Sequence, residues 1–499
     1  MTTLITFLGA NTYSTTTYVA PDSDNKRVTT HYIARALAEI YECINVEIIA
    51  TRVAWEKNGK PLSDALKEIN LKPSPHIIPD GQNKQELQDQ FRALRNLLAT
   101  LRNGLVLDIT LGYRHQPFFA AAALAVLLAA DELPQPAYIT YGAFEARNKD
   151  NNTTPIFDLS SFIHMMRLAF GISIFRQTGH CNLLIEALRA EERHLRQEKI
   201  QGARKEYPKS NTLIGAVERF SHDLSTMRIP ALLLGEKKGK SSASLLLKAL
   251  KSYQGRCDDD HPALVPLLDD LEKMIKPLET NTLFRSQGQR AMSELGNLYL
   301  KFSRFAEAAG LGAESLISRY ADSYAATDAG RPGFNDKSRE EAANRCRISK
   351  DNRSLLDIRN DILHCGFRPS PQPAKGLEDN VKRLNDIITK TPRTILVTRH
   401  AGAREWVTRQ GIVVDEILEH LPPEKIDKTI NPGDLVIGSL PVSLVAQICR
   451  RGGRYKHLSM NIPPDARGRE LSADDMEKFC AKLEEFIIQP AREKDESDS

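Results

Sequence analysis

The chain has 499 residues, and its 68 Lys and Arg side chains nearly balance 64 Asp and Glu, which leaves a formal net charge of +4. A chain of this length exceeds one ordinary hydrophobic core and predicts about three domains of roughly 150 residues each. The small net charge excludes a uniformly basic surface for nucleic acid, so any anion site must be a local patch. Seven cysteines without a CxxC pair or metal-ligand spacing predict reduced thiols in a cytoplasm and no metal site.

Residues 1–155 alternate between short apolar runs and amphipathic segments, which is the pattern of a parallel sheet covered by helices on both faces. The N-terminal run, residues 1–9, has no basic segment before it and predicts a first strand rather than a signal peptide. The apolar run 118–130 is too short to cross a bilayer, so we expect no membrane association. Strands are predicted at 4–8, 46–50, 105–109 and 137–141, and helices near 29–41, 84–101 and 118–129.

Polar loops follow three of these predicted strands, at the sheet edge where ligands of parallel α/β folds bind. Thr110, Gly112 and Arg114 lead into a helix N-terminus and have the chemistry of a phosphate cradle. The alternative is that Gly9 and Gly112 form tight turns and Arg114 makes a surface ion pair, and the sequence leaves both interpretations open. Neither GxGxxG nor GxxxxGK[ST] occurs, so an ordinary dinucleotide or ATP site is not expected. The candidate ligand residues are Gly9, Asn11, Thr12, Tyr13, Thr110, Gly112, Arg114 and Gly142.

Residues 156–390 lack strand patterning and predict an all-helical region. Two loops are expected at 237–240 and 326–335, and the first is basic. The basic residues before position 359 could contact phosphates, but charge alone favours an ordinary solvated face; they are Arg345, Arg347, Lys350 and Arg353. Helices are predicted at 159–188, 212–224, 243–250, 263–275, 292–308 and 377–388, and residues 389–393 are expected to form a linker.

An Arg-x-x-x-x-His pattern at Arg359 and His364 ends an amphipathic helical segment. His moves protons near neutral pH, and Arg stabilises negative charge on a phosphate, which suits metal-free RNA cleavage. The same spacing occurs at 189–194 and 256–261, but those copies enclose carboxylates that repel a polyanion. The Arg359 copy instead has an amide, Asn360, beside the arginine and an apolar stripe that can dock the helix. Arg359, Asn360 and His364 are therefore the first-ranked catalytic candidates.

Residues 391–499 return to an α/β pattern and predict a second, smaller Rossmann-like domain. Strands are expected at 394–397, 435–437 and 457–460, and a closing amphipathic helix at 472–488, with Ser472 and Asp475 spaced as a capping box. Beyond the first two strands lie Arg399, His400, Arg404 and Ser439, at positions where an anionic ligand would bind. The alternative is that His400 caps a helix and that Arg404 forms a local ion pair.

Three sets of motifs resemble known families. The segments 5–9, 108–117 and 141–145 resemble the CARF domain of type III CRISPR-associated ribonucleases. The helical region containing Arg359, Asn360 and His364 resembles the HEPN ribonuclease domain that follows a CARF domain in those proteins. The C-terminal segments 397–403, 433–442 and 467–471 resemble a separate CRISPR-associated family, viewed as a CARF-like ring nuclease.

The resemblance implies a cytoplasmic homodimer, or a higher homo-oligomer, whose CARF pair binds cyclic oligoadenylate, with cyclic tetra-adenylate expected as the allosteric activator. The HEPN pair would then cut single-stranded RNA without a cofactor, and the C-terminal domain would degrade the activator. The implied domains are a sensor at 1–155, a helical linker and ribonuclease at 156–390, and a ring nuclease at 391–499. An alternative from another class is a non-catalytic cyclic-nucleotide-sensing regulator or interaction module.

Overall fold

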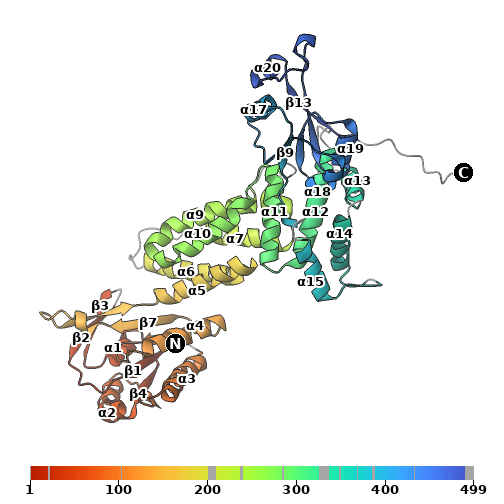
Figure 1. The fold of residues 1–499 in the computed structure, drawn as a ribbon. Coiled ribbons are helices and arrows are strands. Elements are labelled where there is room, and N and C mark those ends of the chain that lie inside the picture. The colour runs from red at the N-terminus through yellow and green to blue at the C-terminus, as the bar shows by residue number, and fades with distance from the viewer. Residues whose placement is uncertain are drawn as a thin grey trace. The chain divides into compact units, whose positions relative to one another are not determined.

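The computed structural model describes residues 2–488, except for 21–22, 103, 201–209, 236–239, 284–285, 325–335, 348–349, 368, 385–387 and 432. The chain forms two compact units: the first comprises Met1–Ser173, Asn182–Ile214 and Asp259–Leu264, and the second comprises Ile174–Cys181, Gly215–Asp258 and Val265–Ser499. An α/β region, a helical region and a smaller α/β domain follow one another along the chain, which confirms the predicted fold class (Figure 1). The predicted loops at 237–240 (apart from Lys240) and 326–335 lie outside the described residues.

The first unit is built on a sheet whose described strands run in the order β3-β2-β8-β7-β6-β1-β4-β5. The strands from β7 through β6, β1 and β4 to β5 are parallel, as predicted. The strands are β1 (Thr2–Leu8), β2 (Thr16–Ala20), β3 (Ser23–Thr30), β4 (Asn45–Thr51), β5 (Pro73–Ile78), β6 (Gly104–Asp108), β7 (Ala137–Gly142) and β8 (Thr153–Asp158).

Helices cover both faces of this sheet because its central strand is apolar on both sides. Leu4 and Leu8 of β1 pack in one core with side chains of α1 (Ile33–Ile40) and α2 (Arg52–Lys67). Ile5 and Phe7 pack in a second core with side chains of the helices on the opposite face, which are α3 (Lys84–Thr100) and α4 (Gln116–Ala129). Successive strand residues point to opposite faces, so a continuous apolar run buries both sides of the strand.

Residues 14–30 differ from the predicted polar loop after the first strand and from the helix predicted to begin near residue 29. They contain the antiparallel pair β2–β3, and the helix begins only at Ile33. Threonine side chains stabilise this pairing: the hydroxyls of Thr17 and Thr29 lie 2.8 Å apart, and the Thr16 hydroxyl lies 2.8 Å from that of Thr154 on β8. β-Branched residues favour strands, and cross-strand Thr pairs add to this preference, so the threonine-rich segment extends the sheet.

Two helices that the sequence predicts as continuous are each broken into two. The predicted helix 159–188 becomes α5 (Ser161–Thr178) and α6 (Asn182–Ile200), with Gly179 between them at a φ of +72°. A glycine in this left-handed conformation ends a helix without steric cost. The predicted helix 292–308 becomes α11 (Ser286–Lys301) and α12 (Phe305–Tyr324), and the break contains Ser303 at a φ of +55°.

The other described α-helices of the central region are α7 (Ser210–Ser225), α8 (Ile229–Leu233), α9 (Ser242–Asp260), α10 (Val265–Ile275), α13 (Asp336–Cys346), α14 (Lys350–Leu363) and α15 (Ala374–Arg383). Among them, α7, α9, α10, α14 and α15 follow the predicted pattern with shifted ends, whereas α8 and α13 were not predicted. Gly215 lies within α7, and a Cβ added there would meet no atom within 4 Å apart from the backbone of its own helix. None of the helices that the structure describes is long and apolar enough to cross a membrane.

The C-terminal domain is a sheet whose described strands run in the order β10-β9-β11-β12-β13. β13 pairs antiparallel with β12, so the predicted closing helix at 472–488 is wrong. Only the short α20 (Ala473–Lys478) is helical there, and the capping box of Ser472 and Asp475 opens it as predicted. Cys480 at a φ of +54° stops the helix before the alternating segment that follows. The strands are β9 (Thr394–Val397), β10 (Glu416–Leu418), β11 (Leu435–Gly438), β12 (Arg454–Ser459) and β13 (Lys482–Phe486).

Candidate functional site

The Arg359 motif lies at the C-terminal end of α14. Leu355, Leu356 and Ile358 are buried and hold this helix against the helical region, as the apolar stripe predicts. Leu363 departs from the predicted stripe, because its side chain is 66% exposed. The packed part of the stripe therefore ends before the last residue of the helix, and the end of α14 reaches the surface.

His364 lies one residue beyond the end of α14, in an exposed turn. Its backbone amide donates to the Asn360 carbonyl at 3.0 Å, so the turn continues the helical path. Cys365 and Gly366 follow with φ angles of +52° and +77° and reverse the chain. The structure thus brings Asn360 and His364 together through the backbone, with the half-buried Arg359 one residue earlier on the same helix end.

Arg359 lies beside a carboxylate from another helix. Glu314 of α12 accepts a hydrogen bond from Arg339 of α13 at 2.5 Å, and its other oxygen lies 3.9 Å from Nη1 of Arg359. The Arg359 side chain is 26% exposed, and its Nε is buried without a hydrogen-bond partner among the residues that the structure describes. Glu314 was not predicted from the sequence, because no motif connects it to a residue 45 positions further along the chain.

Asp361, within the motif, has a structural role. It is buried, and its Oδ2 accepts a hydrogen bond at 2.9 Å from the backbone amide of Gln372. This bond fastens the proline-rich segment after the motif to α14. A buried carboxylate oxygen that binds a backbone amide stabilises the local chain path, so Asp361 helps to define where the exposed turn at His364 begins.

The histidines of the two rejected Arg-x-x-x-x-His copies both lie within the first unit. His261 is buried, and its Nε2 is 3.5 Å from Glu191. The ring of His194 stacks on that of His164 with centroids 4.6 Å apart. Both histidines are thus engaged with neighbouring side chains of that unit, whereas His364 is exposed.

The N-terminal candidate residues gather at the carboxyl edge of the first sheet, around buried Asp108. Asp108 accepts hydrogen bonds from the hydroxyls of Thr6 at 2.6 Å and Thr110 at 2.5 Å. The Thr110 hydroxyl in turn accepts from the Gly142 amide at 2.8 Å. Burial raises the pKa of the Asp108 carboxyl, and the hydrogen bonds from Thr110 and Thr6 oppose that rise. These contacts join the ends of β1, β6 and β7 into one polar centre.

The loop after β1 lies beside the loop after β6. The Gly9 amide donates to the Tyr13 hydroxyl at 2.9 Å, and a Cβ at Gly9 would lie 3.6 Å from the Leu111 carbonyl. Burial raises the pKa of Tyr13 to about 12, so its hydroxyl stays protonated near neutral pH. The structure brings these residues together with Thr110 and Gly142, and half-buried Gly112 lies two residues after Thr110 in the same loop. Asn11, Thr12 and Arg114 lie on the same two loops with exposed side chains.

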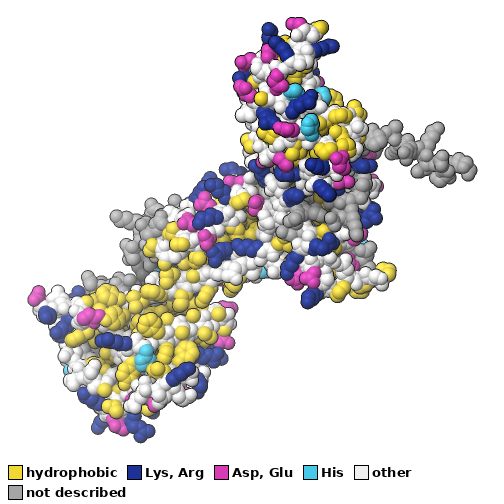
Figure 2. Space-filling model, viewed as in Figure 1, with side chains coloured by type: hydrophobic (Ala, Val, Ile, Leu, Met, Phe, Trp, Pro, Cys, Tyr) yellow, Lys and Arg dark blue, Asp and Glu magenta, His cyan; other side chains and the backbone are white. Residues whose placement is uncertain are grey.

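Hydrophobic side chains are exposed on the first unit next to an apolar cavity. Figure 2 shows yellow side chains gathered on the visible face of this unit. On α4, Phe118 is 77% exposed and Val126 is 46% exposed, and Phe162 of α5 is 53% exposed. A cavity of about 210 Å³ lies between these helices and the sheet, lined only by apolar side chains that include Leu107, Leu124 and Met166. The first unit thus exposes several large apolar side chains of α4 and α5.

The C-terminal candidate site centres on His400, at the N-cap of α17 (Ala401–Arg409). The Nδ1 of His400 lies 2.8 Å from Oε2 of Glu470, and the Ala401 amide donates to Oε1 of the same carboxylate at 3.2 Å. The hydrogen bond from His400 holds the pKa of Glu470 below its ordinary value. Glu470 lies in the segment 467–471 that resembles a CRISPR-associated family, but no role was predicted for it.

The other C-terminal candidates lie around the same sheet edge with different partners. Arg399 is adjacent to His400 and also lowers the pKa of Glu470 through its charge. Arg404 lies one turn along α17, and its Nη2 is 3.9 Å from Glu419. Ser439 follows β11, but its hydroxyl donates to the Leu458 carbonyl at 2.7 Å. The structure therefore brings His400 and Glu470 into direct contact and engages Ser439 in a bond between neighbouring strands.

Comparison with known proteins shows a family match for the C-terminal domain. Residues 395–489 match the family model described as "Putative CRISPR-associated protein (Cas_VVA1548)". The C-terminal domain is similar to this CRISPR-associated family. Among solved structures, the chain is similar to Enterococcus italicus Csm6 bound to cyclic hexa-2'-fluoro-hexa-dAMP, with 8% identity and a TM-score of 0.36, over 78% of this chain and 93% of that one. No curated protein matches the chain.

Proposed function

We propose that this protein is a cyclic-oligoadenylate-activated endoribonuclease of type III CRISPR defence whose C-terminal domain degrades the activator. The observation that carries the proposal is the match of residues 395–489 to a CRISPR-associated family in a chain that also contains the Arg359–His364 motif. The exposed position of that motif, at the end of a packed helix, supports the proposal, because a long single strand of RNA needs an open site.

Arg359, Asn360 and His364 carry the proposed RNA cleavage. A ribose 2′-hydroxyl attacks the adjacent phosphorus, the new 2′-O–P bond forms, and the P–O5′ bond breaks, which leaves a 2′,3′-cyclic phosphate. His364 takes the proton from the 2′-hydroxyl or returns one to the leaving 5′-oxygen. Arg359 stabilises the charge that develops on the phosphoryl oxygens, and Asn360 positions the phosphate or the imidazole. DNA is spared because it lacks the 2′-hydroxyl.

The proposed activator, cyclic tetra-adenylate, binds at the carboxyl edge of the first sheet. Arg114 contacts its phosphates, and the loops after β1, β6 and β7 surround it, with Asp108 and Thr110 holding these loops together. Two copies of the chain meet through the exposed apolar surface of α4 and α5 and form a homodimer. The activator works by binding the cleavage-competent state more tightly than the inactive one.

The proposed ring-opening site uses His400 with Glu470. Glu470 accepts from Nδ1, which fixes the imidazole tautomer and leaves Nε2 able to exchange a proton with the activator. Arg399 and Arg404 contact the scissile phosphate, and an activator 2′-hydroxyl attacks it by the same internal displacement. Ser439 stays a candidate for positioning the ligand, but only as a hydrogen-bond acceptor, since its hydroxyl already donates to the Leu458 carbonyl.

The direct test incubates purified protein with a fluorescent single-stranded RNA, with and without cyclic tetra-adenylate. We expect activator-dependent cleavage that persists in a metal chelator and leaves the matching DNA intact. Arg359→Ala should lower the rate by roughly 10²–10³-fold, because it removes the charge-stabilising group. Activator binding without RNA cleavage would contradict the proposal and select a non-catalytic sensor instead.

A further inference from the structure

Helix α12 contacts both the proposed cleavage site and the C-terminal domain, and all three belong to the second unit. Glu314 lies beside Arg359 of the cleavage motif. Arg319 and Tyr320, five and six residues later, lie against the C-terminal domain. An α-helix rises about 1.5 Å per residue, so roughly 8 Å of one rigid element separates these two sets of contacts.

Arg319 is a buried cation within a polar network. Its side chain is 2% exposed; Nε donates to Gln289 of α11 at 3.1 Å, and Nη2 donates to the Lys390 carbonyl at 2.7 Å. Burial lowers the pKa of Arg319 to about 10, and the charge of Asp434 opposes this fall, so the guanidinium stays charged at neutral pH. The segment predicted as a plain linker between helices and C-terminal domain is thus bound to α12.

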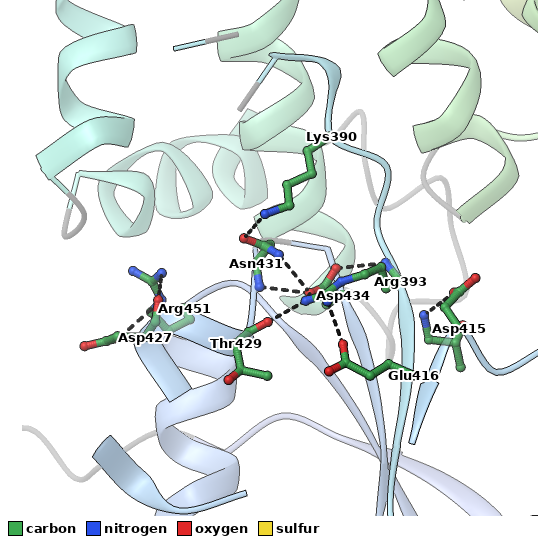
Figure 3. A network of polar contacts seen from close by, with 10 residues as sticks. Lys390, Arg393, Asp415, Glu416, Asp427, Thr429, Asn431, Asp434 and Arg451 are labelled. Carbon is green, nitrogen blue, oxygen red and sulfur yellow. Dashed lines mark hydrogen bonds and ion pairs between the residues drawn. The ribbon is translucent and has the colours of Figure 1, made fainter. Parts of the chain in front are cut away.

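Asp434 is a buried anion whose charge favours the protonated guanidinium of Arg319. It accepts hydrogen bonds from the backbone amides of Arg393 at 2.8 Å and Asn431 at 2.9 Å, and its Oδ2 lies 3.0 Å from Nη2 of Arg393 (Figure 3). Arg393 continues the network to Glu416 at 2.6 Å. A buried network whose members are hydrogen-bonded rigidifies its surroundings, and breaking it leaves an uncompensated charge.

Two glycines let the C-terminal domain approach α12 closely. A Cβ at Gly433 would lie 3.0 Å from Cγ of Arg319, and a Cβ at Gly452 would lie 2.6 Å from the ring of Tyr320. Both glycines have positive φ angles, of +88° and +81°. No side chain fits between the C-terminal domain and α12 at these points, so a shift of the domain must move this helix or break the contact.

Nearer the proposed cleavage site, Glu314 of α12 lies beside the guanidinium of Arg359. Glu314 is fixed by its hydrogen bond to Arg339, and its second oxygen faces Arg359 at 3.9 Å. Because Arg339 compensates its charge, Glu314 can orient Arg359 with reduced repulsion of an approaching phosphate. The long contact to Nη1 leaves the guanidinium only loosely held, so a small displacement of α12 changes where Arg359 points.

We propose that α12 couples the C-terminal domain to the cleavage site, with Glu314 as a positioning residue for Arg359 and the Arg319–Asp434 network as the anchor of the helix. This inference rests on the proposed ribonuclease function. Catalytic geometry is sensitive to displacements of about 1 Å, which cost on the order of 10²-fold in rate. Loosening the anchor should therefore slow RNA cleavage although the anchor lies outside the motif.

The test measures kcat and KM for a fluorescent RNA at saturating cyclic tetra-adenylate in the full-length protein. We expect Glu314→Gln and Arg319→Met each to lower kcat about 10-fold and to change KM less than about twofold, because binding surfaces remain while positioning is lost. The double variant should be no slower than the slower single variant, since both act through one helix. Arg290→Gln is the matched control, because Arg290 of α11 pairs with Asp415 at 3.9 Å with an exposed side chain, and its kcat should not change.

Two further variants keep the outcomes distinct. Gln289→Met removes the acceptor of Arg319 Nε but keeps the charge of Arg319, so it replaces Arg319→Met if hydrogen exchange shows that the latter does not fold. Arg359→Ala tests the proposed function itself: full activity there would refute the ribonuclease site. Loss of activity in Arg359→Ala, together with normal kcat in folded Arg319→Met or Gln289→Met, would overturn the coupling alone. Additive effects of Glu314→Gln and Arg319→Met would also overturn it.

Discussion

At the scale of single residues, the structure explains why some motif positions could be predicted and others could not. Arg359 and His364 stand out in the sequence because their chemistry and spacing are local to one helix. Glu314 and Glu470 do not, because they meet Arg359 and His400 only in the folded chain, 45 and 70 positions away. For Ser439, the sequence predicted the position beyond a strand correctly but not the hydrogen bond of its hydroxyl to the Leu458 carbonyl.

Glu470 provides a residue-level prediction for the ring-opening site. Glu470→Gln should slow the loss of cyclic tetra-adenylate by about tenfold or more. The variant replaces the carboxylate that stabilises the positive charge on His400 when the imidazole takes a proton. Glu405→Gln is the control, since Glu405 forms an exposed pair with Arg409 on the same helix, α17. Chromatography of the remaining activator over time measures both variants, and equal rates for Glu470→Gln and the parent protein would remove Glu470 from the mechanism.

Thr110 provides a second residue-level prediction, on stability. Thr110→Val keeps the shape of the side chain but removes one donor to buried Asp108 and the acceptor of the Gly142 amide. Leaving such groups unpaired costs about 1–3 kcal/mol, so the first unit should unfold at lower denaturant. Thr17→Val, in the exposed Thr17–Thr29 pair, should change stability by about 0.5 kcal/mol or less. Equal shifts in the two denaturation curves would contradict the role of the Asp108 centre.

At the scale of elements, apolar periodicity located most buried strands and helices, whereas chain breaks and edge strands escaped it. β1, β4, β6 and β7 are mostly apolar, and β1, β4 and β6 are largely buried on both faces, so their sequence is diagnostic. The hairpin β2–β3 and the edge strand β13 are polar, and only their pairing with neighbouring strands defines them. The breaks at Gly179 and Ser303 depend on backbone conformation, which a hydrophobic pattern does not report.

The turn that ends α14 gives a prediction at this scale. Gly366→Ala should destabilise the protein by about 1 kcal/mol and slow RNA cleavage, because a φ of +77° strains any side chain and the turn positions His364. Gly215→Ala is the matched control: this glycine lies inside α7 with nothing within 4 Å of its added Cβ, so alanine should stabilise by about 0.5–1 kcal/mol. Circular dichroism melts and RNA cleavage rates compare the two, and the same sign for both would refute this role of the turn.

At the scale of the whole molecule, we propose one chain that senses an activator, cuts RNA and removes the activator. The sequence order of α/β, helical and α/β regions was predicted correctly because each class has its own periodicity. The contacts of α12 with the C-terminal domain were not, because residues such as Tyr320 and Gly452 lie 132 positions apart and their contact has no sequence signature. These contacts make the C-terminal domain a structural neighbour of the cleavage motif within the second unit.

The most direct test of a gated, self-limiting ribonuclease is a single time course of RNA cleavage after a small, fixed dose of cyclic tetra-adenylate. Cleavage by the parent protein should start only after the dose and should then slow as the activator disappears. With His400→Ala, cleavage should start at the same rate and continue until the RNA is consumed. Cleavage without activator, or a parent time course that never slows relative to His400→Ala, would contradict the account.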